Sequence, residues 1–224
     1  MIVQAVDLGL RASRGWVFRN VDLRVDAGQL LALTGRPGSG RTSLLLALAG
    51  HFKTNAGRLT RTGPAALGYI PGLQGPEPAL TVAEHIEERL LLIGRWSRRR
   101  RREQIETTVA MASALAGEPL HPDAKGRELT SLQRQELCLA LAALNEPRLI
   151  VTDDVDVGMD SDERRRLWLG LADLAEQGYA VIAAAREADP DIAVDCYELA
   201  APEPEWRSTP GHRRIAVASA EETS

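Results

Sequence analysis

The sequence predicts an α/β fold in which a parallel sheet is covered by helices on both faces. Short apolar runs at 30–33, 149–152 and 179–185 have the length and composition of buried strands. Segments with helical spacing of apolar residues lie between them, and the first run leads through a glycine-rich turn into a strongly apolar helix. Strands that alternate with helices in this way typically form a parallel sheet.

Composition excludes several classes of protein. The chain has 224 residues, of which 26% are charged and 44% hydrophobic, as in ordinary globular domains. No apolar run approaches the ~20 residues of a membrane span. The N-terminus favours a strand over a signal peptide, so we expect a cytoplasmic protein. A net charge of −4 indicates no general attraction to nucleic acid. The two cysteines, Cys138 and Cys196, lack metal-site spacing and are expected to be buried.

The N-terminal part of the chain predicts strands followed by one short helix. Strands are expected near 2–6 and at 16–25, before the strand at 30–33. The helix after the glycine-rich turn begins near Gly40 and ends at Gly50, a typical helix terminator. Residues 58–70 predict short strands and turns.

The middle of the chain predicts a helical insert at 79–128. Thr81 and Glu84 form a capping-box pattern at the start of one helix, and a second helical pattern ends at Gly117. The strand and helix pattern then resumes, with helices at about 132–144 and 162–176. The tail from 201 onward is rich in Pro and Glu, with a possible added strand at 214–218.

The glycine-rich turn has the form of a phosphate-binding loop. Its spacing matches G-x-x-x-x-G-K-[S/T], except that Arg41 stands where the consensus has Lys. Such a loop directs backbone N–H groups and a helix N-terminus at a polyphosphate. Glycine-rich turns without that function are common, but the flanking strand and helix favour the phosphate loop. The candidate nucleotide-binding residues are Gly35, Arg36, Pro37, Gly38, Ser39, Gly40, Arg41, Thr42 and Ser43.

Two acidic residues follow the apolar strand at 149–152. A phosphate loop needs such a strand, because a carboxylate at its end orients Mg²⁺. Asp153 and the Thr42 hydroxyl are therefore the candidate metal ligands, and Asp154 is the candidate catalytic residue that positions the attacking water. The same pair of acids could instead cap a helix or form a turn.

The order of these motifs resembles the nucleotide-binding subunit of an ABC transporter over roughly residues 2–200. Beyond the phosphate loop and the acidic strand, the segment 68–72 lies where that family has its Q-loop, and 129–135 (LTSLQRQ) resembles the signature L-S-G-G-Q-R-Q. Gly158, Met159 and Asp160 resemble the D-loop. Arg186 lies where the family has its switch histidine, and this position makes it the second candidate catalytic residue.

This resemblance implies a P-loop NTPase with a RecA-like parallel sheet core, an N-terminal antiparallel β subdomain and a helical insert. Residues 1–200 would form a single nucleotide-binding domain, with the helical subdomain at about 79–128 and a C-terminal tail at 201–224. It implies ATP and Mg²⁺ as cofactors and a separate transmembrane permease as partner. It also implies a head-to-tail dimer with itself or a paralogous subunit, on the inner face of the plasma membrane.

Several residues depart from the family pattern around the reacting phosphate. Arg41 replaces Lys, Asp154 replaces the catalytic Glu, Arg186 replaces the switch His, and Gly72 replaces the Q-loop Gln, with Gln74 nearby. Asp is shorter than Glu, and small displacements of a reacting water slow catalysis. We therefore expect ATP binding with weak or impaired hydrolysis. The alternative is a hydrolytically silent regulatory or structural subunit whose partner supplies turnover.

The signature segment is also altered. In the family it presents backbone N–H groups to the γ-phosphate of ATP bound by the opposite subunit. Thr130 keeps the hydroxyl of the family's Ser, whereas Ser131 and Leu132 replace its two glycines. Thr130 and Ser131 are the candidate nucleotide contacts here, and the side chain of Leu132 is expected to crowd the opposing phosphate.

Two further features keep more than one interpretation. The family stacks an aromatic ring on adenine near Ala12, and Trp16 is the nearby candidate, with a core role equally expected. The arginine run at 98–102 favours a solvated surface over a contact with lipid phosphates or a partner loop.

Overall fold

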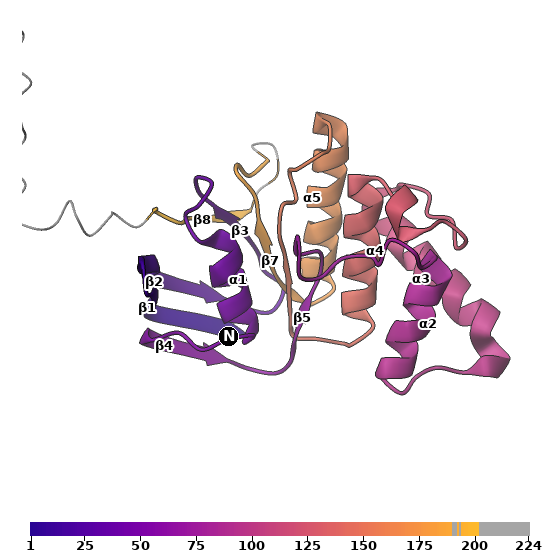
Figure 1. Ribbon diagram of the computed structural model, residues 1–224, viewed down its shortest axis with the longest axis horizontal. Helices are drawn as coiled ribbons and strands as arrows, with labels where there is room; N and C mark the ends of the chain where they lie inside the picture. Colours follow the sequence, from indigo (N-terminus) through magenta and orange to yellow (C-terminus); the bar gives the residue numbers. More distant parts are fainter. Residues whose placement is uncertain (190–191, 193, 202–224) are drawn as a thin grey trace, which may run out of the picture.

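The computed structural model describes residues 1–189, 192 and 194–201, which fold into two sheets and five α-helices (Figure 1). The possible strand at 214–218 lies outside the described residues. None of the helices in the described ranges is long and apolar enough to cross a membrane.

The smaller sheet is antiparallel and comes from the N-terminal part of the chain. Its strands are β1 (Val3–Ala12), β2 (Gly15–Val25) and β4 (Ala56–Arg61), in the order β2-β1-β4. In the centre of this sheet, Val3 of β1 pairs with Val25 of β2 on one side and Arg61 of β4 on the other. This sheet is the antiparallel subdomain that the resemblance implied.

The larger sheet is parallel and has five strands in the order β5-β6-β7-β3-β8. These are β5 (Ala65–Leu67), β6 (Leu149–Thr152), β7 (Ala180–Ala184), β3 (Leu30–Thr34) and β8 (Asp195–Glu198). Every residue of β3, β6 and β7 is buried, as expected for a parallel sheet covered on both faces. The predicted α/β fold class is confirmed.

Strand β8 was not expected from the sequence. It pairs with β3 at the edge of the sheet, and three of its four residues are exposed. Cys196 lies on it and is exposed, so the prediction of two buried cysteines was wrong for Cys196 and correct for Cys138.

Glycines and capping boxes set the ends of the helices. Capping boxes at Thr81, Thr130 and Asp160 open three of the helices, while Gly50 and Gly117 end two of them in the left-handed conformation. The five helices are α1 (Arg41–Ala49), α2 (Val82–Leu92), α3 (Arg101–Ala116), α4 (Ser131–Ala143) and α5 (Ser161–Glu176). Helices α2 and α3 lie within the predicted insert and pack with α4 in a hydrophobic cluster of their own.

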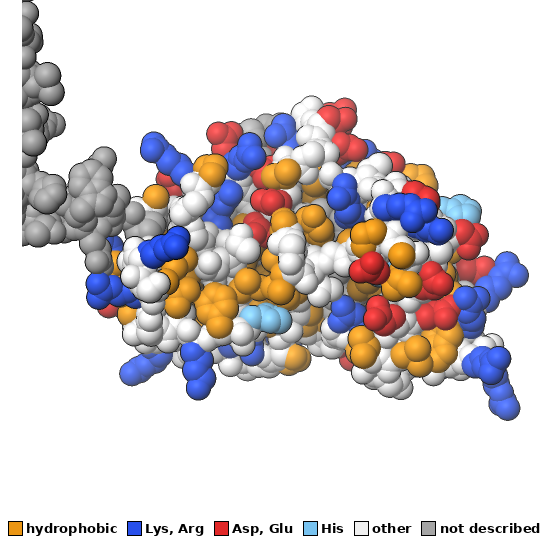
Figure 2. All heavy atoms as spheres, in the orientation of Figure 1, with side chains coloured by type: hydrophobic (Ala, Val, Ile, Leu, Met, Phe, Trp, Pro, Cys, Tyr) orange, Lys and Arg blue, Asp and Glu red, His pale blue; other side chains and the backbone are white. Residues whose placement is uncertain are grey.

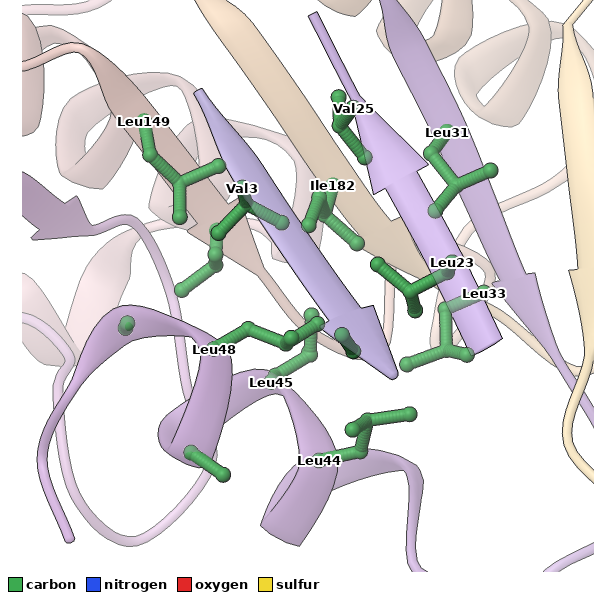
Figure 3. Close-up of a cluster of buried hydrophobic side chains, with 14 of the residues drawn as sticks. Val3, Leu23, Val25, Leu31, Leu33, Leu44, Leu45, Leu48, Leu149 and Ile182 are labelled. Atoms are coloured by element: carbon green, nitrogen blue, oxygen red, sulfur yellow. The ribbon is translucent and has the colours of Figure 1, made fainter. Parts of the chain in front are cut away.

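The main core joins the two sheets through α1. Figure 3 shows side chains of β1, β2 and α1 converging with Leu31, Leu33, Leu149 and Ile182 of the parallel strands. Full burial of one such side chain stabilises the fold by about 1.5–3 kcal/mol. The opposite face of the parallel sheet packs on α4 and α5. This packing fixes the carboxyl ends of β3, β6 and β7 beside one another, where the candidate site lies.

Candidate functional site

The loop between β3 and α1 has backbone angles that favour glycine at three positions. Gly35, Gly38 and Gly40 have φ of 147°, 82° and 94°. A Cβ atom at Gly35 would lie 2.6 Å from the carbonyl oxygen of Leu199, and one at Gly40 would lie 2.5 Å from that of Val17. The loop is thus packed between β2 and the end of β8, so Gly35 and Gly40 are required by space as well as by conformation, and Gly38 by conformation alone.

A buried hydroxyl inside this loop has no partner. Ser39 is fully buried, and its Oγ makes no hydrogen bond within the described part of the chain. Its oxygen lies 2.9 Å from the position a Gly35 Cβ would take, so it faces the interior of the loop. Buried polar atoms normally have partners, and an exception of this kind is consistent with a loop that accommodates a polar ligand.

Arg41 is the first residue of α1, and its side chain turns toward the end of β7. Its Nη1 donates a hydrogen bond to the carbonyl oxygen of Ala185. The residue that departs from the Lys consensus therefore has a bonding partner within the chain, next to Arg186.

Thr42 and Asp153 meet although 111 residues separate them in sequence. The Thr42 hydroxyl donates to Oδ2 of Asp153, while the other oxygen, Oδ1, accepts from the backbone N–H of Asp154 at 2.8 Å. Asp153 is buried at the end of β6. Within the described residues, no cluster of three or more His, Cys, Asp or Glu is arranged as a metal site.

Asp154 occupies a strained and charged position. Its φ of 51° is in the left-handed region, uncommon for residues other than glycine. Burial, followed by the nearby carboxylates of Asp153 and Asp156, raises its pKa, and Arg41 and Arg186 oppose that rise. Both arginines thus act electrostatically on the carboxylate that the sequence assigned to catalysis.

Arg186 lies beside the phosphate loop. The two line a common hollow of about 430 Å³, together with Thr34 and Glu198. The backbone N–H of Arg186 donates to Oδ2 of Asp156 at 2.9 Å, which holds the segment after β7. The structure therefore brings together the loop residues 35–43, the two aspartates and Arg186.

The candidate nucleotide contacts of the signature segment, Thr130 and Ser131, lie at the start of α4. Thr130 caps α4, accepting from the N–H of Gln133 at 3.2 Å. Ser131 packs against Gly158, where an added Cβ would lie 2.6 Å from its Oγ. It also lines a hollow of about 160 Å³ with Tyr69, Arg134, Asp154 and Met159.

The expected crowding by Leu132 is wrong. Its side chain is completely buried in the cluster that joins α4 and α5 to the parallel sheet. Leu132 therefore points into the core and not toward an opposing phosphate. The glycine that the family has at this position carries no side chain, so the family pattern does not predict where the Leu132 side chain points. The packing of α4 sets that direction.

Gln135 is a positioning residue that the sequence did not single out. It is buried, its Nε2 donates to the carbonyl oxygen of Asp153 at 2.8 Å, and its Oε1 accepts from the Thr152 hydroxyl at 2.7 Å. These two hydrogen bonds connect α4 to the end of β6, next to the candidate metal ligand Asp153. The signal available was its place as the last residue of the signature-like segment 129–135.

The structure also shows the surroundings of Gly72 and Trp16, two residues that the sequence analysis named. The replacement Gly72, with φ of 73°, lies in a turn closed by paired backbone hydrogen bonds between Ile70 and Gln74. Trp16 is half-buried with Arg11 5.8 Å from its ring centroid, so part of its aromatic surface already has a cationic neighbour.

Comparisons with known proteins agree with this arrangement. Residues 18–156 match the model of the ABC transporter family. The chain is 30% identical over 218 residues to the cytochrome c biogenesis ATP-binding export protein of Alkalilimnicola ehrlichii, covering 90% of this chain and 86% of that protein. It is 27% identical over 190 residues to a zinc import ATP-binding protein of Jannaschia sp., covering 83% and 73%.

Solved structures share the fold. A dimeric ATP-binding cassette in a post-hydrolysis state with ADP and Pi superposes with a TM-score of 0.67 at 21% identity, covering 83% of this chain and 88% of that one. The family match covers more than half of the chain and includes the phosphate loop and both aspartates. The chain belongs to the ABC transporter family, as an ATP-binding subunit.

Proposed function

We propose that this subunit binds ATP together with Mg²⁺, hydrolyses it slowly and couples it to a separate transmembrane permease. Residues 1–200 act as one nucleotide-binding domain in this proposal. The observation that carries it is the contact between Thr42 and Asp153, which joins the phosphate loop to the acidic end of β6. These are the two protein groups that a magnesium nucleotide requires at such a site.

The residues present fit Mg²⁺ and a polyphosphate. Mg²⁺ is usually held by one or two oxygen ligands of the protein, with waters and phosphate oxygens completing an octahedron. The Thr42 hydroxyl and the Asp153 carboxylate supply that number. The glycine angles of the loop and the unpartnered Ser39 hydroxyl support a cradle for phosphate oxygens. Bound Mg²⁺ would neutralise phosphate charge.

Slow hydrolysis follows from the groups around the reacting phosphate. Asp154 has one methylene less than Glu, so a water that it orients lies further from the phosphate. Arg41 already uses its Nη1 in a bond to the carbonyl oxygen of Ala185, which competes with a bidentate grip on a phosphate. Arg186 carries a fixed charge where the family uses a switchable imidazole. Each tenfold loss in rate corresponds to a barrier increase of only 1.36 kcal/mol, so small faults accumulate quickly.

Assembly with partners follows the family pattern. The superposable ATP-binding cassette is dimeric in its ADP-bound state. In a head-to-tail dimer of this chain, with itself or with a paralogue, Thr130 and Ser131 would contact nucleotide held by the opposite loop. The permease would place the subunit on the inner face of the plasma membrane. The alternative, a hydrolytically silent regulatory subunit, is supported by the same replacements at Arg41, Asp154 and Arg186.

Calorimetry with Mg-ATP, with and without a chelator, tests the proposal. Binding is expected with wild type and is expected to be lost in Asp153→Ala, while Asp173→Ala, an exposed acidic position on α5, serves as the matched control. The absence of both heat and thermal stabilisation in folded wild-type protein would overturn it. ATPase assays of the complex with its permease, using Asp154→Ala in this subunit, distinguish slow turnover from a silent subunit.

A further inference from the structure

The connection between α2 and α3 places hydrophobic and basic residues at one end of the molecule. We call residues 91–102 the arginine tip. Helix α2 ends at Leu92, the short helix η1 spans Arg98–Arg100, and α3 starts at Arg101 and runs back along α2. Figure 2 shows basic and hydrophobic side chains together at the end of the molecule where Figure 1 places this connection.

Three arginines of the tip carry uncompensated charge. Arg98, Arg99 and Arg100 are exposed and form no ion pair within the described ranges. The neighbouring arginines do have partners, which are Glu146 for Arg95, Glu87 for Arg101 and Glu106 for Arg102. These ion pairs hold the tip against α2, α3 and the segment that follows α4. The three unpaired arginines face solvent.

The arginines do not stabilise the start of α3. Arg100 is its N-cap and makes no side-chain cap hydrogen bond, and Arg101 and Arg102 follow in the first turn. Cations at a helix N-terminus oppose the helix dipole, and Ser, Thr, Asp or Asn are the favoured caps. A local sequence that contradicts helix preferences in this way is expected where function selects the residues.

Exposed hydrophobic side chains lie next to the charges. Leu92 is 74% exposed and Leu91 59%, the two highest values among the large hydrophobic residues of the described ranges. A hollow of about 570 Å³ adjoins the tip, and its lining includes Arg95, Trp96, Ser97, Arg100, Gln104 and Thr107. Cations, an indole and exposed leucines together form a surface that suits the boundary between lipid headgroups and acyl chains.

We propose that the arginine tip binds anionic lipid headgroups at a membrane surface. The whole chain carries a net charge of −4, so only a local cluster such as this one would attract an anionic bilayer. Three consecutive residues of a 3₁₀-helix point about 120° apart, so the arginines spread around the tip and meet a surface end-on. The inference uses the proposed function only in placing the subunit beside a membrane.

Sedimentation with vesicles tests this contact in the full chain, without nucleotide or permease. Wild type should bind vesicles with about one third phosphatidylglycerol and not pure phosphatidylcholine vesicles, and binding should weaken between about 0.05 M and 0.5 M salt. Each basic residue at such a surface strengthens binding about fivefold, so Arg98→Gln/Arg99→Gln/Arg100→Gln should reduce it on the order of 100-fold. The double variant Leu91→Gln/Leu92→Gln should bind vesicles more weakly than wild type does, most clearly at high salt.

The matched control removes three other exposed arginines, as Arg14→Gln/Arg19→Gln/Arg58→Gln, and should keep nearly wild-type binding. Absence of binding by wild type, or equal losses in the two triple variants, would overturn the proposal. So would a tip variant that binds vesicles normally but no longer copurifies with the permease, because the tip would then be a protein contact. Unchanged Mg-ATP binding in the tip variant keeps this outcome separate from the nucleotide site.

Discussion

The guanidinium of Arg41 donates a hydrogen bond to the carbonyl oxygen of Ala185, immediately before Arg186. The bond links the start of α1 to the end of β7, and so links the phosphate loop to the segment that carries the second candidate catalytic residue. A lysine at position 41 would carry its charge on a smaller, more flexible group.

The first prediction is that Arg41→Lys strengthens Mg-ATP binding by roughly tenfold, because an ammonium fits the tightly wrapped loop and no longer competes for Ala185. Calorimetry measures the change. Arg58→Lys, an exposed exchange on β4 and away from the loop, should leave the affinity unchanged. Weaker binding in Arg41→Lys would show that the guanidinium itself grips the phosphates.

The second prediction concerns turnover. Wild type should hydrolyse ATP below about 1 per second, and Asp154→Glu should raise the rate by at least about tenfold, since the longer side chain brings the oriented water closer to the phosphate. Asp173→Glu, on the exposed face of α5, is the matched control. A fast wild-type enzyme whose activity is abolished by Asp153→Ala would contradict the expectation of impaired hydrolysis.

Local signals in the sequence were sufficient for much of the fold. Three buried apolar runs predicted β3, β6 and β7, and glycine stops and caps predicted where the helices begin and end. Strand β8 was missed because its residues, Asp195–Glu198, are mixed in polarity and lie at the sheet edge, where burial imposes no clear pattern.

The candidate site was predicted in its parts but not in its contacts. Spacing identified Thr42 and Asp153, and the structure joins them. The bond from Arg41 to Ala185 and the role of Gln135 depend on tertiary packing between distant segments, which no local pattern encodes. The direction of Leu132 was misjudged for the same reason, because a helix start can turn either face toward the core.

The third prediction follows from the burial of the Leu132 side chain in the core. Leu132→Ala should lower the free energy of unfolding by about 2–5 kcal/mol, because it leaves a cavity in the core between α4 and the sheet. Chemical denaturation measures the loss, with Leu92→Ala on the exposed end of α2 as a control that should stay within about 0.5 kcal/mol. Analytical ultracentrifugation should show no gain in ATP-dependent dimer. A clear gain would restore the crowding interpretation.

The fourth prediction concerns Glu136, which is fully buried on α4. Burial raises its pKa to about 7, despite a hydrogen bond from the backbone N–H of Glu118, and the carboxylate of Glu118 adds to the rise while Arg166 opposes it. The folded state therefore binds this proton more tightly than the unfolded state does. The resulting stability is fully present below pH 4.5 and is lost as pH rises through about 7.

Glu136→Gln keeps the size of the side chain and removes the ionisation. Its Tm should match wild type at low pH and exceed it by several degrees at pH 8, by the usual relation between stability and melting temperature. Thermal unfolding at both pH values measures the difference, and the exposed Glu176→Gln serves as the matched control. Equal Tm values of wild type and Glu136→Gln at pH 8 would show that the ionised Glu136 does not lower the stability of the fold.

The last prediction concerns the close packing of α5 against the end of α3. A Cβ atom at Gly170 would lie 1.8 Å from the carbonyl oxygen of Leu115, a backbone atom that cannot rotate away. Helix propensity alone favours Gly170→Ala by about 1 kcal/mol. We expect the opposite sign, a loss of several kcal/mol, because the two helices must separate to admit the methyl group. Urea denaturation measures this, and Ala110→Gly at an exposed position of α3 gives the propensity cost for comparison. If Gly170→Ala is as stable as wild type, α3 and α5 lie further apart than this contact indicates.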